Sequence, residues 1–159
     1  VHHLEPLQDA LDRARRAEKW AKEGEPKRNA LCVAYSPRSG AERLVRGRWD
    51  ENPPLTRRLL RYADLPRAGE VPSRAAYELL ALGREAGEAL PGEALVAEAL
   101  RILGRKEMKR AYREELEAWL RTGEDVRRLA EELILARPFA EALDQAGVPV
   151  ESREVWDAH

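Results

Sequence analysis

The sequence predicts a mainly α protein, a helical bundle of five to six helices with a small β-hairpin near residues 30–49. Apolar residues recur at helical spacing in several segments, many of which begin at a Pro and end at a Gly. One short apolar segment, residues 30–35, lacks this spacing and has turn-forming residues on both sides. The 159 residues are enough to bury a core without disulfide or metal support.

The N-terminal segment is predicted to form a helix from Pro6 to Gly24. Proline suits the first position of a helix, because its missing N–H would have no partner there. Glycine ends a helix readily, since it adopts positive φ without strain. The apolar residues that share one face of this helix are Leu7, Ala10, Leu11, Ala14, Ala17 and Ala21.

A β-hairpin is predicted from strands at 30–35 and 43–49, joined by a loop of about five residues at 36–40. Two strands alone are marginal in water, so the hairpin must pack on helices or pair with a third strand. The candidate third strand is the segment 148–150. Strand alternation predicts that Arg46 and Arg48 are exposed while Val45 and Trp49 are covered.

A second helix is predicted after the Asn-Pro-Pro sequence at 52–54, with Pro53 as its first residue and its end at 64–66. The residues expected to face inward are Leu55, Leu59, Leu60, Tyr62 and Ala63. The residues expected to face outward are Arg57, Arg58 and Arg61.

The remaining chain is predicted to be a helical bundle over residues 72–147. Its expected helices are 72–90, 93–103, 106–121, 124–136 and 139–145, with Pro138 breaking or restarting the last one. Gly83 and Gly87 form a small patch that lets another helix approach closely. We therefore expect a single domain over 1–159, made of a helix, hairpin and Arg-rich helix (1–67), the bundle (72–147) and a C-terminal tail (148–159).

Composition excludes several classes of protein. The single Cys32 forms no internal disulfide and no Cys-rich zinc site, and one cysteine is typical of the reducing cytosol. Histidine occurs only at positions 2, 3 and 159, so the folded body holds no Ser-His or Cys-His nucleophile pair. The longest apolar run has six residues, so no segment spans a membrane. We expect a cytoplasmic protein without a cofactor. Its few thermolabile side chains and many charges in helix-spaced pairs suit a thermophile.

Charge points to one candidate surface. The formal net charge is −1, but residues 36–67 contain eight Arg against four acidic residues. Trp49 and Tyr62 lie among them, and Tyr35 directly precedes them. Arginine neutralises phosphates and aromatic rings stack on bases, so this pattern favours RNA or single-stranded DNA, or else an acidic protein surface, as the partner. The leading hypothesis is a non-catalytic binding or interaction protein. Its candidate contact residues are Arg38, Arg46, Arg48, Arg57, Arg58 and Arg61.

Two alternatives stay open beside this hypothesis. Glu114 and Glu117 on one expected helix, with Glu141 and Asp144 on another, resemble the ExxE and ExxD motifs of the MazG type of all-α nucleotide pyrophosphohydrolases. The resemblance implies a Mg²⁺ ion held by these four carboxylates, because residues three apart share a helix face. In a chain so rich in Glu, solvated ion pairs account for the same spacing. The third hypothesis is a purely structural homo-oligomer.

Overall fold

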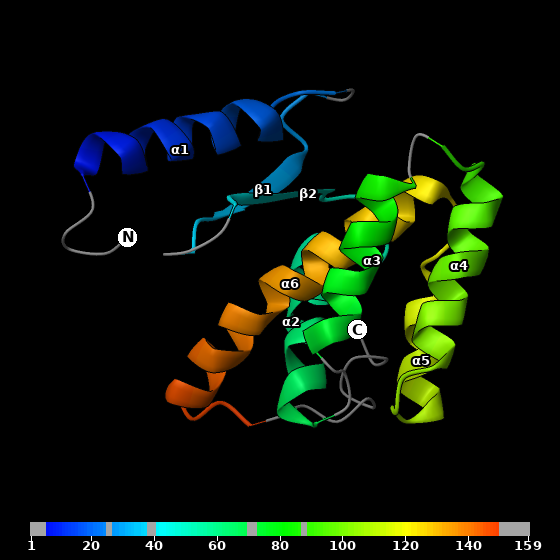
Figure 1. Ribbon diagram of the computed structural model, residues 1–159. Coiled ribbons are helices and arrows are strands. Elements are labelled where there is room, and N and C mark those ends of the chain that lie inside the picture. Colours follow the sequence, from blue (N-terminus) through cyan, green and yellow to red (C-terminus); the bar gives the residue numbers. More distant parts are fainter. Residues whose placement is uncertain (1–5, 25–26, 38–40, 70–72, 87–88, 150–159) are drawn as a thin grey trace. The chain divides into compact units, whose positions relative to one another are not determined.

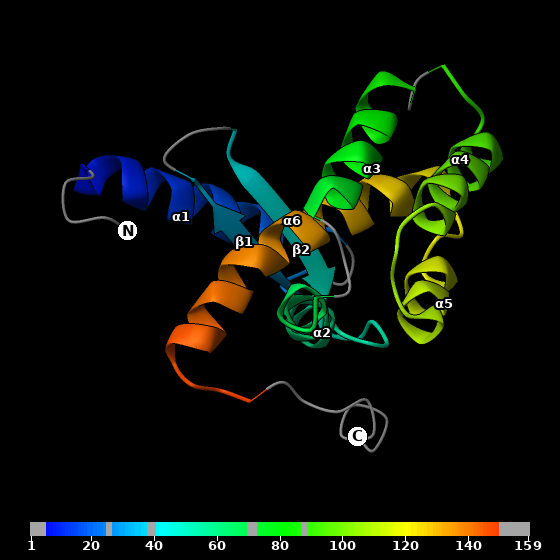
Figure 2. The same cartoon turned by 60° about the horizontal axis from the view of Figure 1, so that its bottom comes forward.

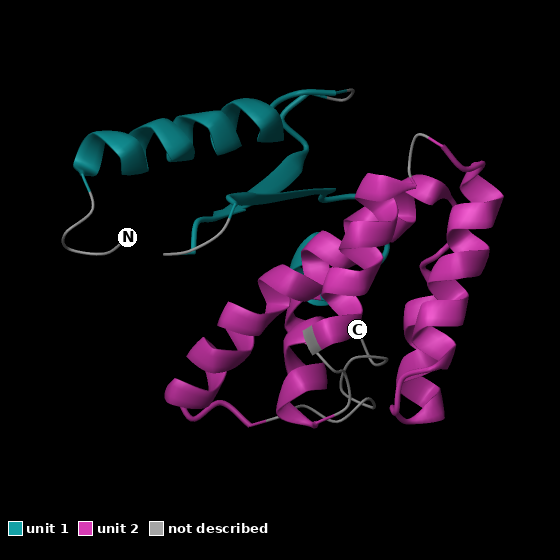
Figure 3. Cartoon of the chain, viewed as in Figure 1, with its two compact units in different colours: residues 1–58 teal, residues 59–159 magenta. Residues whose placement is uncertain are grey.

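The computed structural model describes residues 6–24, 27–37, 41–69, 73–86 and 89–149, and over these ranges it contains six helices and one two-stranded sheet (Figure 1). The predicted mainly α fold with a small β-hairpin is confirmed. The chain divides into two compact units, residues 1–58 and 59–159 (Figure 3). The boundary falls inside the helix α2 (Leu55–Arg67), whose first turn belongs to unit 1.

Unit 1 consists of a helix, a hairpin and the start of α2. Helix α1 (Leu7–Ala21) has Pro6 as its N-cap, and Gly24 follows the helix with φ +85°. Strands β1 (Ala30–Tyr35) and β2 (Arg43–Arg48) pair antiparallel, from Ala30 opposite Arg48 to Tyr35 opposite Arg43. The predicted strand positions are confirmed, except that β2 ends at Arg48 rather than at Trp49. Within the described residues no strand joins these two, and Val150 of the expected third strand lies outside them.

Helix α2 differs from the prediction at both ends. The Asn52–Pro53 peptide bond is cis and the helix begins at Leu55, so the prediction that Pro53 is the first helical residue is wrong. The helix continues through Pro66 to Arg67, because Ala68 N–H still donates to the carbonyl of Asp64 across the last turn. A proline removes only its own N–H from the helix, and the following turn can close without it.

Unit 2 contains the rest of α2 and four further helices, α3 (Ser73–Glu85), α4 (Gly92–Gly104), α5 (Arg110–Ala118) and α6 (Gly123–Gln145). Helices α3 and α6 make the most extensive helix–helix contact and lie side by side in two views (Figures 1 and 2). The expected close approach at Gly83 is confirmed, since an added Cβ there would lie 3.6 Å from Cα of Arg127. Gly87 lies outside the described residues.

Helix α6 is the longest element and passes through Pro138 without a break, so the predicted interruption is wrong. Its N-terminus is fixed by a capping box, in which Thr122 and Asp125 each accept a hydrogen bond from the other's backbone N–H. Proline at 138 costs the helix one hydrogen bond, and burial of the neighbouring Leu135, Ala136 and Ala140 offsets that loss.

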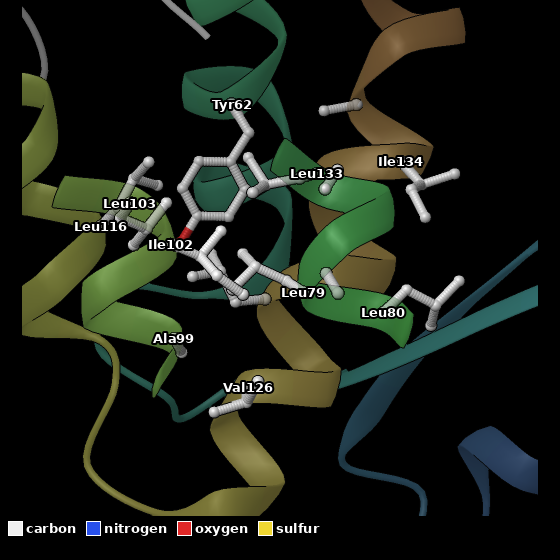
Figure 4. Packing of buried hydrophobic residues seen from close by; sticks show 14 of the residues in the cluster. Tyr62, Leu79, Leu80, Ala99, Ile102, Leu103, Leu116, Val126, Leu133 and Ile134 are labelled. Atoms are coloured by element: carbon white, nitrogen blue, oxygen red, sulfur yellow. The ribbon is translucent and has the colours of Figure 1, made fainter. Parts of the chain in front are cut away.

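One hydrophobic core holds unit 2 together. The ring of Tyr62 lies among side chains from α3, α4, α5 and α6, including Leu79, Ile102, Leu103 and Leu116 (Figure 4). Leu79, Leu103 and Leu116 are completely buried. The inward placement of Tyr62 and Ala63 is confirmed, whereas Leu60, also expected inside, is exposed.

Candidate nucleic-acid interface

The two faces of the hairpin have different neighbours within unit 1. Side chains at even positions, among them Ala30, Cys32 and Ala34, lie on the face that α1 covers. Odd positions lie on the other face, where Val45 is buried and Gly47 lies directly against Leu55 of α2. A Cβ at position 47 would collide with Leu55, so the start of α2 can pack there only against a glycine.

Arg46 lies on the α1 face, where it stabilises the end of the helix. Its guanidinium donates a hydrogen bond to the carbonyl of Glu23, beside Gly24. A cation at a helix C-terminus is favourable, because the last carbonyls lack helical partners and carry partial negative charge. Arg46 is half-buried and its Nε is completely buried. The expectation that Arg46 is exposed is therefore wrong, because α1 covers this face.

Arg48 is half-exposed and forms a two-pronged ion pair with Asp50. Its Nε and Nη2 donate to the two carboxylate oxygens at 2.8 and 2.7 Å. The hydrogen bond raises the pKa of Arg48 and lowers the pKa of the Asp50 carboxyl. The Asp50 carboxylate therefore competes with a phosphate for the N–H donors of this guanidinium.

Arg58 is buried, so its expected outward position is wrong. Within unit 1 its guanidinium donates to Glu51 at 2.9 Å and to the carbonyl of Pro53 at 2.8 Å. These bonds attach the first turn of α2 to the segment that follows the hairpin. A buried arginine with such partners is a structural group.

Arg61 is also buried, and the expectation that it faces outward is wrong because, like Arg58, it pairs with a glutamate of a neighbouring segment. In unit 2 its guanidinium donates to both carboxylate oxygens of Glu115 on α5 at 3.0–3.1 Å. It also lies 5.0 Å from the centre of the Tyr112 ring, within cation–π range. Burial acts to lower the pKa of Arg61, but the hydrogen bond to Glu115 and the charges of Glu115, Tyr112 and Asp64 together outweigh it, so the pKa is raised. Arg61 therefore connects α2 to α5.

Among the described candidate arginines, Arg46, Arg48 and Arg57 are all partly exposed, but Arg46 bonds to the carbonyl of Glu23 just after α1. Arg48 and Arg57 therefore remain as candidate contact residues. Arg57 is half-buried on the first turn of α2. Arg38 lies outside the described residues. The six guanidinium groups therefore do not form one solvent-facing surface in the described part of the chain.

Trp49 is the aromatic residue that the sequence prediction placed wrongly. It was expected to be covered, yet 53% of it is exposed. Strand β2 ends at Arg48, and although the Trp49 N–H still donates to the carbonyl of Asn29, its side chain lies beyond the paired strands. Trp20 on α1 is exposed as well. The sequence analysis missed these exposed tryptophans in the basic unit. For Trp49 the reason is that strand alternation does not show where a strand ends.

Charge divides between the two units in a way that the near-zero total conceals. Unit 1 contains 13 basic and 9 acidic residues, whereas unit 2 contains 15 basic and 20 acidic residues. Unit 1 thus carries a formal charge of +4 and unit 2 a charge of −5. A local positive field of this kind attracts polyanions to one part of the chain.

The four carboxylates of the metal alternative have other neighbours. Glu114 accepts from Arg110 at 2.6 Å, Asp144 from Arg67 at 2.7 Å, and Glu141 lies 3.5 Å from Arg137. Glu117 is half-buried. Within the described ranges, no three His, Cys, Asp or Glu side chains are grouped so that they could hold a metal ion. The convergence on one Mg²⁺ ion that this alternative needs is therefore not found.

An open groove of about 510 Å³ lies in unit 1 between α1 and β1. Small side chains line it, chiefly alanines of both elements, with Arg13 and Glu18 among the α1 residues. Cys32 lies on the β1 side, and burial raises the pKa of its thiol despite the opposing effect of Arg46.

Comparison with known proteins finds no matching family model, no matching curated protein and no matching solved structure. Over the residues that the structure describes, no helix is both long enough and apolar enough to cross a membrane.

Proposed function

We propose that this protein is a non-catalytic binding protein that contacts single-stranded nucleic acid through unit 1. The observation that carries the proposal is Trp49, a largely exposed tryptophan in the unit that holds the positive charge. Base–aromatic stacking contributes about 1–3 kcal/mol per base and tolerates any sequence, because every base has a π face. The contact residues that we propose are Arg48, Trp49 and Arg57.

The proposal favours single strands over duplexes. An exposed ring can stack only on a base that has been freed from its own pairing partners. Neighbouring arginines then neutralise the flanking phosphates, and this contribution depends on salt. Because Arg48 already pairs with Asp50, competition from that carboxylate reduces the free energy gained from a phosphate contact.

Fluorescence anisotropy with a labelled dT oligonucleotide at about 50 mM salt tests the proposal, since electrostatic attraction is strong there. Trp49→Ala should weaken binding about tenfold, in line with the loss of one stacked base. Asp50→Asn should strengthen binding, because it frees the Arg48 guanidinium for phosphate. Trp119→Phe in unit 2 is the matched control and should change nothing. No binding by the wild type, or equal binding by Trp49→Ala, would overturn the proposal.

Intrinsic fluorescence gives a second readout with the same oligonucleotide. Stacking on a base quenches tryptophan emission, so titration with dT should quench the wild type. Trp49→Phe keeps an aromatic ring for stacking but should lose most of the quenching. Quenching that survives this substitution in full would place the contact elsewhere.

A further inference from the structure

The outer edge of β1 carries backbone groups without partners in the described part of the chain. The Trp49 N–H donates to the carbonyl of Asn29, so positions 29 and 49 form a hydrogen-bonded pair of the antiparallel ladder. Such pairs alternate along a strand, which makes Leu31, Val33 and Tyr35 the residues bonded to β2. Ala30, Cys32 and Ala34 therefore direct three N–H and three C=O groups away from β2. No hydrogen bond among the described residues reaches them.

This edge lacks the features that usually protect an edge strand. Its sequence, Ala-Leu-Cys-Val-Ala-Tyr, contains no charge and no proline, whereas β2 contains three arginines in six residues. Charged side chains, prolines and bulges normally prevent further pairing at a sheet edge. The unprotected strand is the one whose outward groups are unpaired.

Helix α1 is displaced toward this same edge. It packs mainly on β1 and far less on β2 (Figure 2). A helix is about 10 Å wide and strands lie about 4.8 Å apart, so a helix centred on β1 also covers the position beyond it. The open groove lies between α1 and β1 and is lined by Ala30, Cys32 and Ala34. A strand added to β1 would centre α1 over a three-stranded layer.

A second copy of the chain does not fit this position. Antiparallel pairing of two β1 strands about a two-fold axis would place both α1 helices over the shared seam, with axes about 5 Å apart. Packed helices need 8–10 Å between axes. The occupant must therefore be a strand that carries no covering helix of its own.

We propose that β1 is a strand-addition site for an extended peptide of a partner protein, about six residues long, with apolar side chains at alternate positions and acidic residues at its ends. Backbone hydrogen bonds to Ala30, Cys32 and Ala34 hold the peptide, as in other β-augmentation complexes. Every second side chain enters the groove beneath α1, whose alanines leave room for residues of the size of Val or Leu. The acidic ends complement the positive charge of unit 1.

Hydrogen exchange followed by NMR on the full chain tests this site residue by residue. In the free protein, the amides of Cys32 and Ala34 should exchange fast and those of Leu31, Val33 and Tyr35 slowly. The probe is the synthetic peptide Glu-Val-Thr-Val-Thr-Val-Glu. Saturation with it should slow exchange at Cys32 and Ala34 at least tenfold, while Leu31 and Val33 stay unchanged. Slow exchange at Cys32 and Ala34 in the free protein, or no slowing with peptide, would overturn the proposal.

Two controls separate strand addition from unspecific apolar binding. The same peptide N-methylated at its valines keeps the side chains but loses alternate N–H donors, so it should bind at least tenfold more weakly. Ala34→Pro removes one outward N–H of the protein without touching the bonds to β2, since edge positions tolerate proline. Its affinity for the unmodified peptide should fall by a similar factor. Equal affinity of the methylated and unmethylated peptides would show that backbone pairing is not the mode of binding.

Discussion

Replacement of Arg61 by alanine tests the finding that this arginine, expected on the surface, is instead buried in unit 2. The Arg61 side chain is 7% exposed, and its carboxylate partner on Glu115 is 25% exposed. Removing one partner of a fully buried pair costs about 3–5 kcal/mol, because the other charge is left uncompensated. A fully exposed pair contributes about 0–1 kcal/mol. Since water reaches Glu115 in part, we expect Arg61→Ala to cost about 2–3 kcal/mol.

Thermal and urea unfolding, followed by circular dichroism, measure this loss. For a chain of this size 1 kcal/mol corresponds to about 2–4 °C, so Tm should fall by about 4–12 °C. Arg61→Lys should lose part of this amount, because lysine keeps the charge but cannot bond both carboxylate oxygens with a planar fork. In a double-mutant cycle with Glu115→Ala, the coupling energy should be about 1–2 kcal/mol.

Arg110→Ala is the matched control for this cycle. Arg110 also pairs with a glutamate of α5, Glu114 at 2.6 Å, but its side chain is 89% exposed. Exposed pairs of this kind are screened by water and salt, so Tm should stay within about 2 °C of the wild type. If Arg61→Ala costs no more than Arg110→Ala, or if the coupling with Glu115 is zero, the structural role assigned to Arg61 is wrong.

Three further predictions concern packing and pH. Gly47→Ala should destabilise the protein by about 1–3 kcal/mol, because the added Cβ collides with the start of α2. Gly83→Ala should be neutral or stabilising by up to about 1 kcal/mol, and urea unfolding midpoints measure both effects. Leu103→Ala, at a completely buried site, should cost about 2–5 kcal/mol in the same assay, and a loss below 1 kcal/mol would contradict the assigned core. The hydrogen bond from Lys106 lowers the pKa of Glu78 in the folded state. The ionised Glu78 therefore stabilises the fold fully above its unfolded-state pKa of about 4.3, and this stabilisation is lost as the pH falls through the lower folded-state pKa. Between pH 6 and pH 3 the free energy of unfolding should therefore fall less for Glu78→Gln than for the wild type. An equal fall in both proteins would refute this linkage.

Helical periodicity was sufficient to predict the fold class, because apolar spacing and Gly or Pro boundaries are local properties of the sequence. Every predicted helix has a counterpart in the structure, and the hairpin strands lie within one residue of the predicted positions. The errors at Pro66 and Pro138 share one cause, whereas at Pro53 the helix simply begins two residues later than predicted. A proline only removes a single donor and restricts the preceding residue, and neighbouring packing decides whether the helix continues through it.

The candidate site was harder to predict, because it depends on which face of each element is covered. Alternation correctly places Arg46 and Arg48 together on one face of β2, but it does not show that α1 covers that face. Likewise, helical spacing groups Arg58 and Arg61 without showing that Glu51 and Glu115 lie close enough to pair with them. Such pairings join residues distant in sequence, and one sequence carries no local signal for them.

The dependence of oligonucleotide binding on salt tests the proposed function most directly. For single strands the slope of log K against log salt is about −0.7 for each phosphate neutralised, so contacts by Arg48 and Arg57 predict a contribution of about −1.4. The double variant Arg48→Ala/Arg57→Ala should flatten the slope by that amount. The charge-matched double variant Arg101→Ala/Arg110→Ala in unit 2 should leave it unchanged. Equal slopes for the wild type and the unit 1 variant, or no binding at about 50 mM salt, would contradict the account.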